Sequence, residues 1–152
     1  MTRRNPKIGQ SPVVLYYPTM AAPTKTVVLR GPDYGHTEGI DKRQVIQLSA
    51  ADEQIVYSRG PKSFHVRANV SNLNRTQRDE FEDFWDNYAD GAKNTFEVVI
   101  PDYSTATDDG TLTRSTHYTG CEFEAGELDI PEPNNGFFSV PLNFRASDKA
   151  FI

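Results

Sequence analysis

Cysteine and long apolar runs are scarce in this sequence, and each shortage excludes a class of protein. Cys121 is the sole cysteine of the 152 residues, so neither an intramolecular disulfide nor a multi-cysteine zinc site can form. The longest apolar run, residues 13–17, is far shorter than the roughly 20 residues that cross a bilayer. No signal-peptide stretch follows Arg3 and Arg4. We therefore expect neither a membrane segment nor an export signal.

Catalytic signatures are missing as well. His36, His65 and His117 lie far apart, and no serine or cysteine stands in a nucleophile-elbow motif. Glycine-rich phosphate-binding loops do not occur, and the aspartates of residues 102–110 lack the spacing of an EF-hand loop. We expect a protein that is not an enzyme, with no catalytic, cofactor-binding or metal-binding residues and no cofactor.

Acidic residues outnumber basic ones, but the charge is unevenly distributed. The formal net charge is -5; residues 1–70 carry ten Lys/Arg against five Asp/Glu, whereas residues 71–152 carry six against sixteen. An acidic balance opposes binding to a phosphate backbone, so nucleic-acid binding is not expected. This uneven charge distribution has two interpretations. It can attract neighbouring copies of the chain to one another, or it can belong to an ordinary solvated surface.

Prolines are concentrated at the start of the chain. Pro6, Pro12, Pro18 and Pro23 block a continuous helix and disfavour a central strand, which predicts an extended arm over residues 1–24. The apolar middle of this arm is suited to docking as an edge strand, on its own domain or on a neighbour, and a disordered tail is the alternative. The candidate contacts between subunits are Arg3, Arg4, Val13, Leu15, Tyr17, Arg30, Lys42, Arg43 and Arg59.

Residues 25–152 have the signals of a single β-rich domain. β-Branched or apolar stretches predict strands over residues 26–30, 44–48 and 54–57, and Gly and Pro punctuate a predicted loop over 31–41. Alternation of apolar and polar residues predicts half-buried strands over 64–70 and 138–144. Pro141 lies inside the second of these, which indicates an edge position or a bulge.

One helix is predicted over about residues 76–90. Thr76 is positioned to cap its first turn, and Gly91 is suited to a left-handed cap at its end. Aromatic residues at i, i+3, i+4 and i+7 form one stripe, which indicates the face that packs on the core. These predicted core anchors are Phe81, Phe84, Trp85 and Tyr88. With about seven strands, the fold class is mainly β, an antiparallel β-sandwich or open barrel with one α-helix packed on it.

The second half of the chain resembles the small tail proteins of tailed bacteriophages that share the tail-tube fold, among them minor tail and distal tail proteins. The resemblance covers about residues 64–145 and rests on order and spacing. The aromatic helix is followed by a break at Gly91, a strand from Phe96 to Pro101, a strand with Tyr118 and Phe123, and the closing strand around Phe138.

The resemblance implies a structural virion protein, assembled in the host cytoplasm and located in the tail. It implies a homo-oligomeric ring of six copies at the tail tip, with other tail proteins above and below and DNA passing through the channel without specific binding. A ring at the neck, or a tail-completion or terminator ring, is the alternative position. From another class, a monomeric glycan-binding module is suggested by the loop aromatics Tyr34 and Tyr103.

Overall fold

The computed structural model describes residues 12–29, 36–102, 114–132 and 136–152. Ten strands lie within these residues: β1 (Val13–Pro18), β2 (Pro23–Leu29), β3 (His36–Asp41), β4 (Gln44–Leu48), β5 (Gln54–Ser58), β6 (Ser63–Leu73), β7 (Phe96–Pro101), β8 (Ser115–Phe123), β9 (Phe138–Ala146) and β10 (Asp148–Phe151). Helix α1 (Arg75–Asp83) continues into a π-helical turn over Phe84–Tyr88. The predicted fold class, mainly β with one packed helix, is confirmed, although about seven strands was too low a count.

Most of the strands form one antiparallel sheet, in which β8 pairs with β10 over residues 116–119 and with β9 at Glu122 and Phe123. The sheet has eight strands in the order β2-β1-β7-β8-β9-β6-β3, with β10 also paired to β8, while β4 and β5 form a separate hairpin. Gly120, with φ of 60°, lies against Ser147 between β9 and β10, where a Cβ atom would collide with the Ser147 hydroxyl. Glycine is therefore required at position 120, because an L side chain disfavours that backbone conformation and has no room.

The described part of the predicted N-terminal arm docks on the chain's own domain, but as an inner strand and not as an edge strand. Strand β1 lies inside the sheet, paired with β2 on one side and β7 on the other. Val13 and Leu15 are fully buried in the chain's own core. The prolines that suggested an arm do not interrupt this strand, because Pro12 precedes it and Pro18 is its last residue. Residues 1–11 lie outside the described part of the chain.

A second correction concerns the predicted loop over residues 31–41. Residues 36–41 form strand β3, which pairs along its whole length with β6. Its sequence combines a glycine with several polar residues, which are depleted in strands. Tertiary contacts compensate for this weak strand propensity, because His36 and Glu38 form hydrogen bonds with side chains from β8 and β10.

The central strands β6 and β9 follow the predicted alternation. Val66 and Val70 of β6 are fully buried, as are Val140 and Leu142 of β9, and the two strands pair in register. Pro141 lies in the part of β9 that pairs with β6 alone, because pairing with β8 is confined to Phe123 and Glu122 opposite residues 144 and 145. The predicted local edge at this proline is thus confirmed.

Helix α1 is capped two residues earlier than the sequence suggested. Asn74, not Thr76, is the N-cap; its side chain accepts a hydrogen bond from the Gln77 backbone, and the Gln77 side chain accepts one from Asn74 N–H. This reciprocal capping box satisfies two free N–H groups at the helix start. Gly91, with φ of 62°, donates its N–H to the Trp85 carbonyl at 3.0 Å, which confirms the predicted left-handed end.

Aromatic side chains connect the helix to the far end of the core. Phe84 of the helix contacts Phe96 at a centroid distance of 5.4 Å, Phe96 lies 6.3 Å from Phe144, and Phe144 lies 5.4 Å from Tyr118. These rings are buried, and burial of such area is the main source of stability in a domain of this size. The core is thus bounded by α1 at one end and by the region of Tyr118 at the other.

Candidate assembly surface

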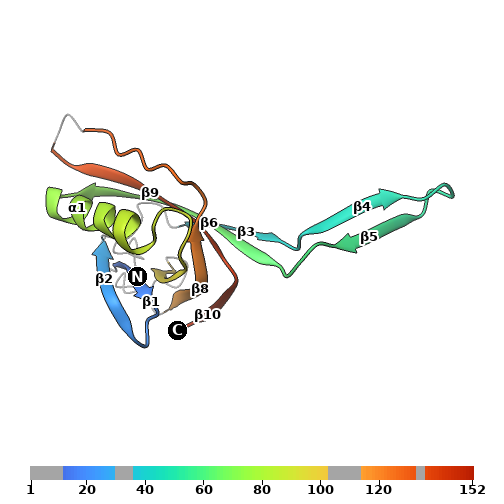
Figure 1. Cartoon of the computed structure of the whole chain (residues 1–152), viewed down its shortest axis with the longest axis horizontal. Helices are drawn as coiled ribbons and strands as arrows, with labels where there is room; N and C mark the ends of the chain where they lie inside the picture. The colour runs from blue at the N-terminus through green and yellow to red at the C-terminus, as the bar shows by residue number, and fades with distance from the viewer. Residues whose placement is uncertain (1–11, 30–35, 103–113, 133–135) are drawn as a thin grey trace, which may run out of the picture.

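The hairpin of β4 and β5 projects far from the rest of the chain, on the side opposite α1 (Figure 1). Its large apolar side chains are exposed to an unusual degree: Ile46 is 61% and Leu48 72% exposed. Val56 and Tyr57 on the second strand are also exposed. Contiguous apolar surface of this kind marks an interaction site.

Both faces of the hairpin are apolar, and both strands lack charged residues. Cross-strand pairing puts Val45 opposite Tyr57 on one face, and Ile46 opposite Val56 on the other. A lone two-stranded hairpin is marginally stable in water, and strands that remain exposed commonly carry charges against unwanted pairing. The hairpin therefore has the composition of a segment that another surface covers.

Basic residues surround the root of the hairpin. The backbone N–H of Arg59 donates to the Arg43 carbonyl at 2.7 Å, which closes the root. The Asp41 carboxylate accepts from the Arg43 N–H at 2.7 Å, and this bond holds the pKa of Asp41 below its usual value. Lys42, Arg43 and Arg59 are exposed around this closure. The hairpin thus presents apolar strands above a positively charged root.

A polar cluster fixes strand β3, from which the hairpin emerges, to the end of the core. The Tyr118 hydroxyl donates to Glu38 Oε1 at 2.8 Å, and Lys149 Nζ donates to Glu38 Oε2 at 2.6 Å. His36 Nε2 lies 3.1 Å from the Tyr118 hydroxyl. Because these residues come from β3, β8 and β10, the cluster joins the edge strand of the sheet to strands across the core.

The same contacts set the charge states of the cluster. Burial lowers the pKa of His36, although Asp102 and Glu38 act in the opposite direction. Burial alone would raise the pKa of Glu38, but the bonds from Lys149 and Tyr118 outweigh it, so the net pKa is lowered. Burial and Glu38 raise the pKa of Tyr118 far above its usual value. At neutral pH the cluster therefore holds a neutral imidazole, a carboxylate and a phenol donor.

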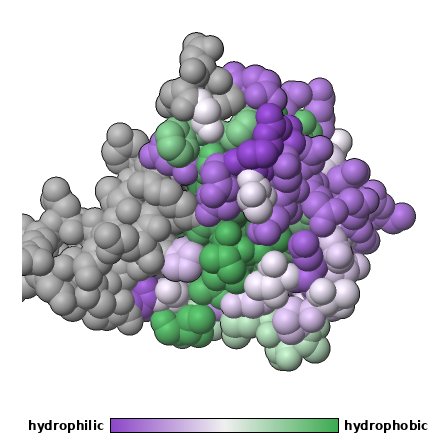
Figure 2. Space-filling model, turned by 90° about the vertical axis from the view of Figure 1, so that its left-hand side faces the viewer, coloured by the Kyte–Doolittle hydropathy of each residue, from purple (hydrophilic) through white to green (hydrophobic). Residues whose placement is uncertain are grey.

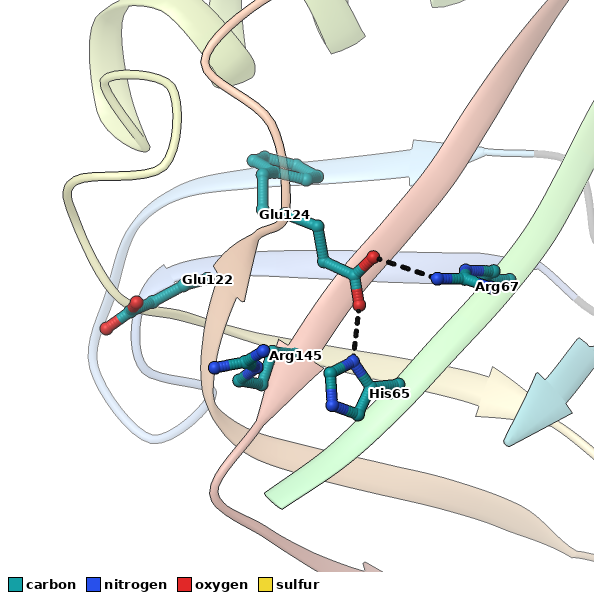
Figure 3. A pocket seen from close by; sticks show the side chains of 6 residues that line it. His65, Arg67, Glu122, Glu124 and Arg145 are labelled. Carbon is teal, nitrogen blue, oxygen red and sulfur yellow. Dashed lines mark hydrogen bonds and ion pairs between the residues drawn. The ribbon is translucent and has the colours of Figure 1, made fainter. Parts of the chain in front are cut away.

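A charged pocket of about 460 Å³ lies on the sheet beside the root (Figure 3). Glu124 reaches His65 Nδ1 at 2.8 Å and Arg67 at 3.5 Å, while Glu122 and Arg145 line the same hollow. The His65 side chain is half-buried between the carboxylates of Asp41 and Glu124. These contacts make the pocket a charged surface on the sheet.

Among the described residues, no group of three or more His, Cys, Asp or Glu side chains is arranged to hold a metal ion. No helix in this part of the chain has the length and apolar character to span a bilayer.

The structure separates the predicted site residues into several groups. Phe81 and Phe84 are fully buried, whereas Trp85 and Tyr88 are half-buried at the margin of the core. Val13 and Leu15 are wrong as subunit contacts because their side chains are inside the chain's own core. Tyr17 is half-buried and meets Tyr88 edge-on with ring centroids 5.7 Å apart. The remaining candidates are Lys42, Arg43 and Arg59 at the hairpin root, and Arg3, Arg4 and Arg30 outside the described residues.

The two loop aromatics behind the glycan-binding alternative, Tyr34 and Tyr103, also lie outside the described residues. Sequence reasoning identified the hairpin strands but not their exposure. The sequence feature that distinguishes β4 and β5 is a run of adjacent apolar residues without any charge. A strand with one face on the core and one in solvent alternates apolar and polar residues instead. The cluster of His36, Glu38 and Lys149 had no local signal, because Glu38 is separated from Lys149 by 111 positions.

Comparison with known proteins supports the fold. No family model matches the sequence, and no curated protein matches it. A chain of the PVC sheath–tube complex, from an extracellular contractile injection system in its extended state, superposes with a TM-score of 0.53 at 9% identity over 95% of this chain and 90% of that chain. At that identity the likeness shows a shared fold.

Two further solved structures are similar at lower scores. A chain of the virion of a native gene transfer agent particle has a TM-score of 0.48 at 13% identity, over 92% of this chain and 95% of that chain. A chain of the anti-feeding prophage cap, described as the tube-terminating cap, has a TM-score of 0.48 at 9% identity, over 100% of this chain and 93% of that chain.

Proposed function

We propose that this protein is a structural subunit of a phage-like tail or injection particle, assembled through its β4–β5 hairpin. The single observation that carries the proposal is the exposed, uncharged, two-faced apolar hairpin. Such a segment loses apolar exposure only when another surface covers it, and burial of apolar area drives association. The fold shared with a sheath–tube chain gives the class of assembly in which that burial is expected.

The finer proposal is a ring of six copies at the tail tip, with other tail proteins above and below. It rests on the sequence resemblance over residues 64–145, with a neck or terminator ring as the alternative position. A hairpin on one side of the subunit and α1 on the other fit head-to-tail contacts, which close into a ring when the rotation between copies permits.

Removal of the hairpin tests the proposal. Positions 43 and 59 already face each other across the root, so residues 44–58 can be replaced by a two-residue Asn-Gly turn without moving β3 or β6. We expect the intact chain to form multimers in sedimentation velocity and electron microscopy. The shortened chain should stay monomeric with an unchanged melting temperature.

Two outcomes would contradict the proposal. One is an intact chain that stays at 17.1 kDa up to its solubility limit and whose hairpin binds no other tail protein. The other is a shortened chain that assembles like the intact one. A control with Val28→Lys, which changes an exposed apolar residue of β2 far from the hairpin, should assemble normally.

A further inference from the structure

The surface around Trp85 is hollowed at the end of the molecule that carries α1. Three hollows of about 210, 440 and 420 Å³ all include Trp85 in their walls. They lie between the helical turn and the segment after β8, where Leu128 and Ile130 are half-buried against the core. We call this continuous surface the Trp85 groove. Its apolar floor consists of Trp85, Phe123, Leu128, Ile130 and Pro141.

Carboxylates line the rim of the Trp85 groove. Glu82 and Asp86 come from the helical segment, Asp90 follows it, and Glu127 comes from the segment after β8. Three cations line the same hollows and pair with rim carboxylates: Arg78 with Glu82, Lys93 with Asp90, and Arg67 with Glu124. Asp86 and Glu127 therefore carry the excess negative charge of the rim. Figure 2 views the molecule from this end, with hydrophilic side chains gathered over one part of the surface and apolar side chains exposed beside them. An apolar floor with an acidic rim fits an apolar partner that carries positive charge.

The hairpin of the same chain has the complementary character. Its strands are apolar and uncharged, and Lys42, Arg43 and Arg59 surround its root. The hairpin cannot reach the groove of its own chain, because the two lie at opposite ends of the molecule (Figure 1). A second copy supplies a hairpin that is free to do so, and electrostatic complementarity of this kind sets register between partners.

We propose that the Trp85 groove receives the β4–β5 hairpin of a second copy of this chain. Ile46, Leu48 and Val56 contact the apolar floor, and the basic root lies against the carboxylates of the rim. The inference deepens the proposed function and rests on it, since it names the acceptor of the hairpin. Each copy then donates one hairpin and accepts another, which is a heterologous contact that propagates from copy to copy.

The proposal separates donor from acceptor, so two complementary variants test it. Ile46→Lys/Leu48→Lys damages only the hairpin, and Asp86→Lys/Glu127→Lys damages only the rim of the groove. All four side chains are exposed, so the folded domain should be unaffected. Each variant alone should self-associate at least about tenfold more weakly than the intact chain, because it lacks one half of every contact.

An equimolar mixture of the two variants is the decisive measurement. It contains one intact hairpin and one intact groove, on different chains, so it should form a 1:1 dimer and nothing larger. The matched control for the rim variant is Glu80→Lys/Asp148→Lys, which changes charge equally at exposed positions outside the groove and should assemble normally. The control for the hairpin variant is Val28→Lys.

Disulfide trapping locates the contact. Cys121 is buried, so it does not compete with introduced thiols. Chains carrying Leu48→Cys and Leu128→Cys should cross-link to each other on mild oxidation. Val28→Cys with Leu128→Cys should not.

The possible failures have different meanings. A rim variant that assembles normally, or a mixture that stays monomeric, overturns the groove as acceptor but leaves a hairpin-based assembly in place. A hairpin variant that assembles normally overturns both proposals. An intact chain that stays monomeric while its hairpin binds a different tail protein overturns the second copy as occupant.

Discussion

Strands β6 and β4 are both rich in apolar residues, but they put those residues in opposite environments. In β6, Phe64 and Val66 are buried while Arg67 between Val66 and Ala68 faces solvent. In β4, Ile46 and Leu48 are exposed and no charged residue alternates with them. Alternation assigns one face to the chain's own core, whereas adjacent apolar residues give two faces that this core does not use. The apolar residues of the body are therefore buried in the chain's own core, whereas those of the hairpin remain exposed, as the proposed assembly requires.

The largest effect that tests this comparison is expected at Phe84. Phe84→Ala removes a fully buried ring that contacts Phe96 and Phe123, so it should reduce the free energy of unfolding by about 3–5 kcal/mol. Trp85→Ala, one residue further on, removes a half-buried ring and should cost only about 1–2 kcal/mol. Urea unfolding of both variants measures the difference. Equal losses would show that Trp85 belongs to the core after all.

The parts of this body that sequence reasoning predicted are those with periodic signals. The period of two in β6 and the aromatic stripe at Phe81 and Phe84 each follow from one face meeting the core. Together they define the fold class. The helix cap was misplaced by two residues because Asn74 and Thr76 are both acceptable caps, and the Gln77 side chain decides between them.

Elements fixed by distant contacts could not be predicted in this way. Strand β1 was taken for an arm because prolines surround it, although its neighbour β7 lies about 80 residues further along the chain. Strand β3 has weak strand propensity and is held by Tyr118 and Lys149. The adjacent apolar residues of the hairpin indicate two apolar faces, but whether other parts of the chain cover those faces depends on distant elements.

A second, smaller effect is expected where the hairpin's supporting strand meets the body. Lys149→Met retains the packing of the aliphatic part of the side chain but leaves the Glu38 carboxylate without the Lys149 ammonium. It should reduce the free energy of unfolding by about 1–3 kcal/mol. The control is Lys93→Met, which removes a solvent-exposed partner of Asp90 and should have almost no effect. Thermal melts at neutral pH compare the two. Equal stability would mean that β3 is fixed mainly by its pairing with β6.

A pH-dependent effect of His36 should be smaller still. Burial lowers the pKa of His36 in the folded chain. As the pH falls below about 6.5, the usual pKa of a histidine, the unfolded chain therefore binds a proton before the folded chain does. The stability that the neutral imidazole contributes is therefore complete above that pH. It is lost as the pH falls through the lower pKa that His36 has in the folded chain. The lowered pKa of Glu38 acts in the same direction at more acidic pH. Between pH 7.5 and 5.5, His36→Gln should lose less unfolding free energy than the intact chain, and an equal loss would exclude His36 as the cause.

The smallest effect on stability is expected in the hairpin itself, at Leu48. Leu48→Ser changes an apolar residue that is already in water, so the free energy of unfolding of the monomer should change by less than about 0.5 kcal/mol. The same substitution in the body, Leu142→Ser, buries a hydroxyl in a fully covered site and leaves a cavity, which should cost about 3–5 kcal/mol. Self-association should respond in a different way. Leu48→Ser should weaken it in sedimentation velocity while the melting temperature of the monomer stays constant, because the side chain becomes buried only between copies. A hairpin whose Leu48→Ser variant melts as early as Leu142→Ser would be packed within its own chain, and the contrast between the two regions would be lost.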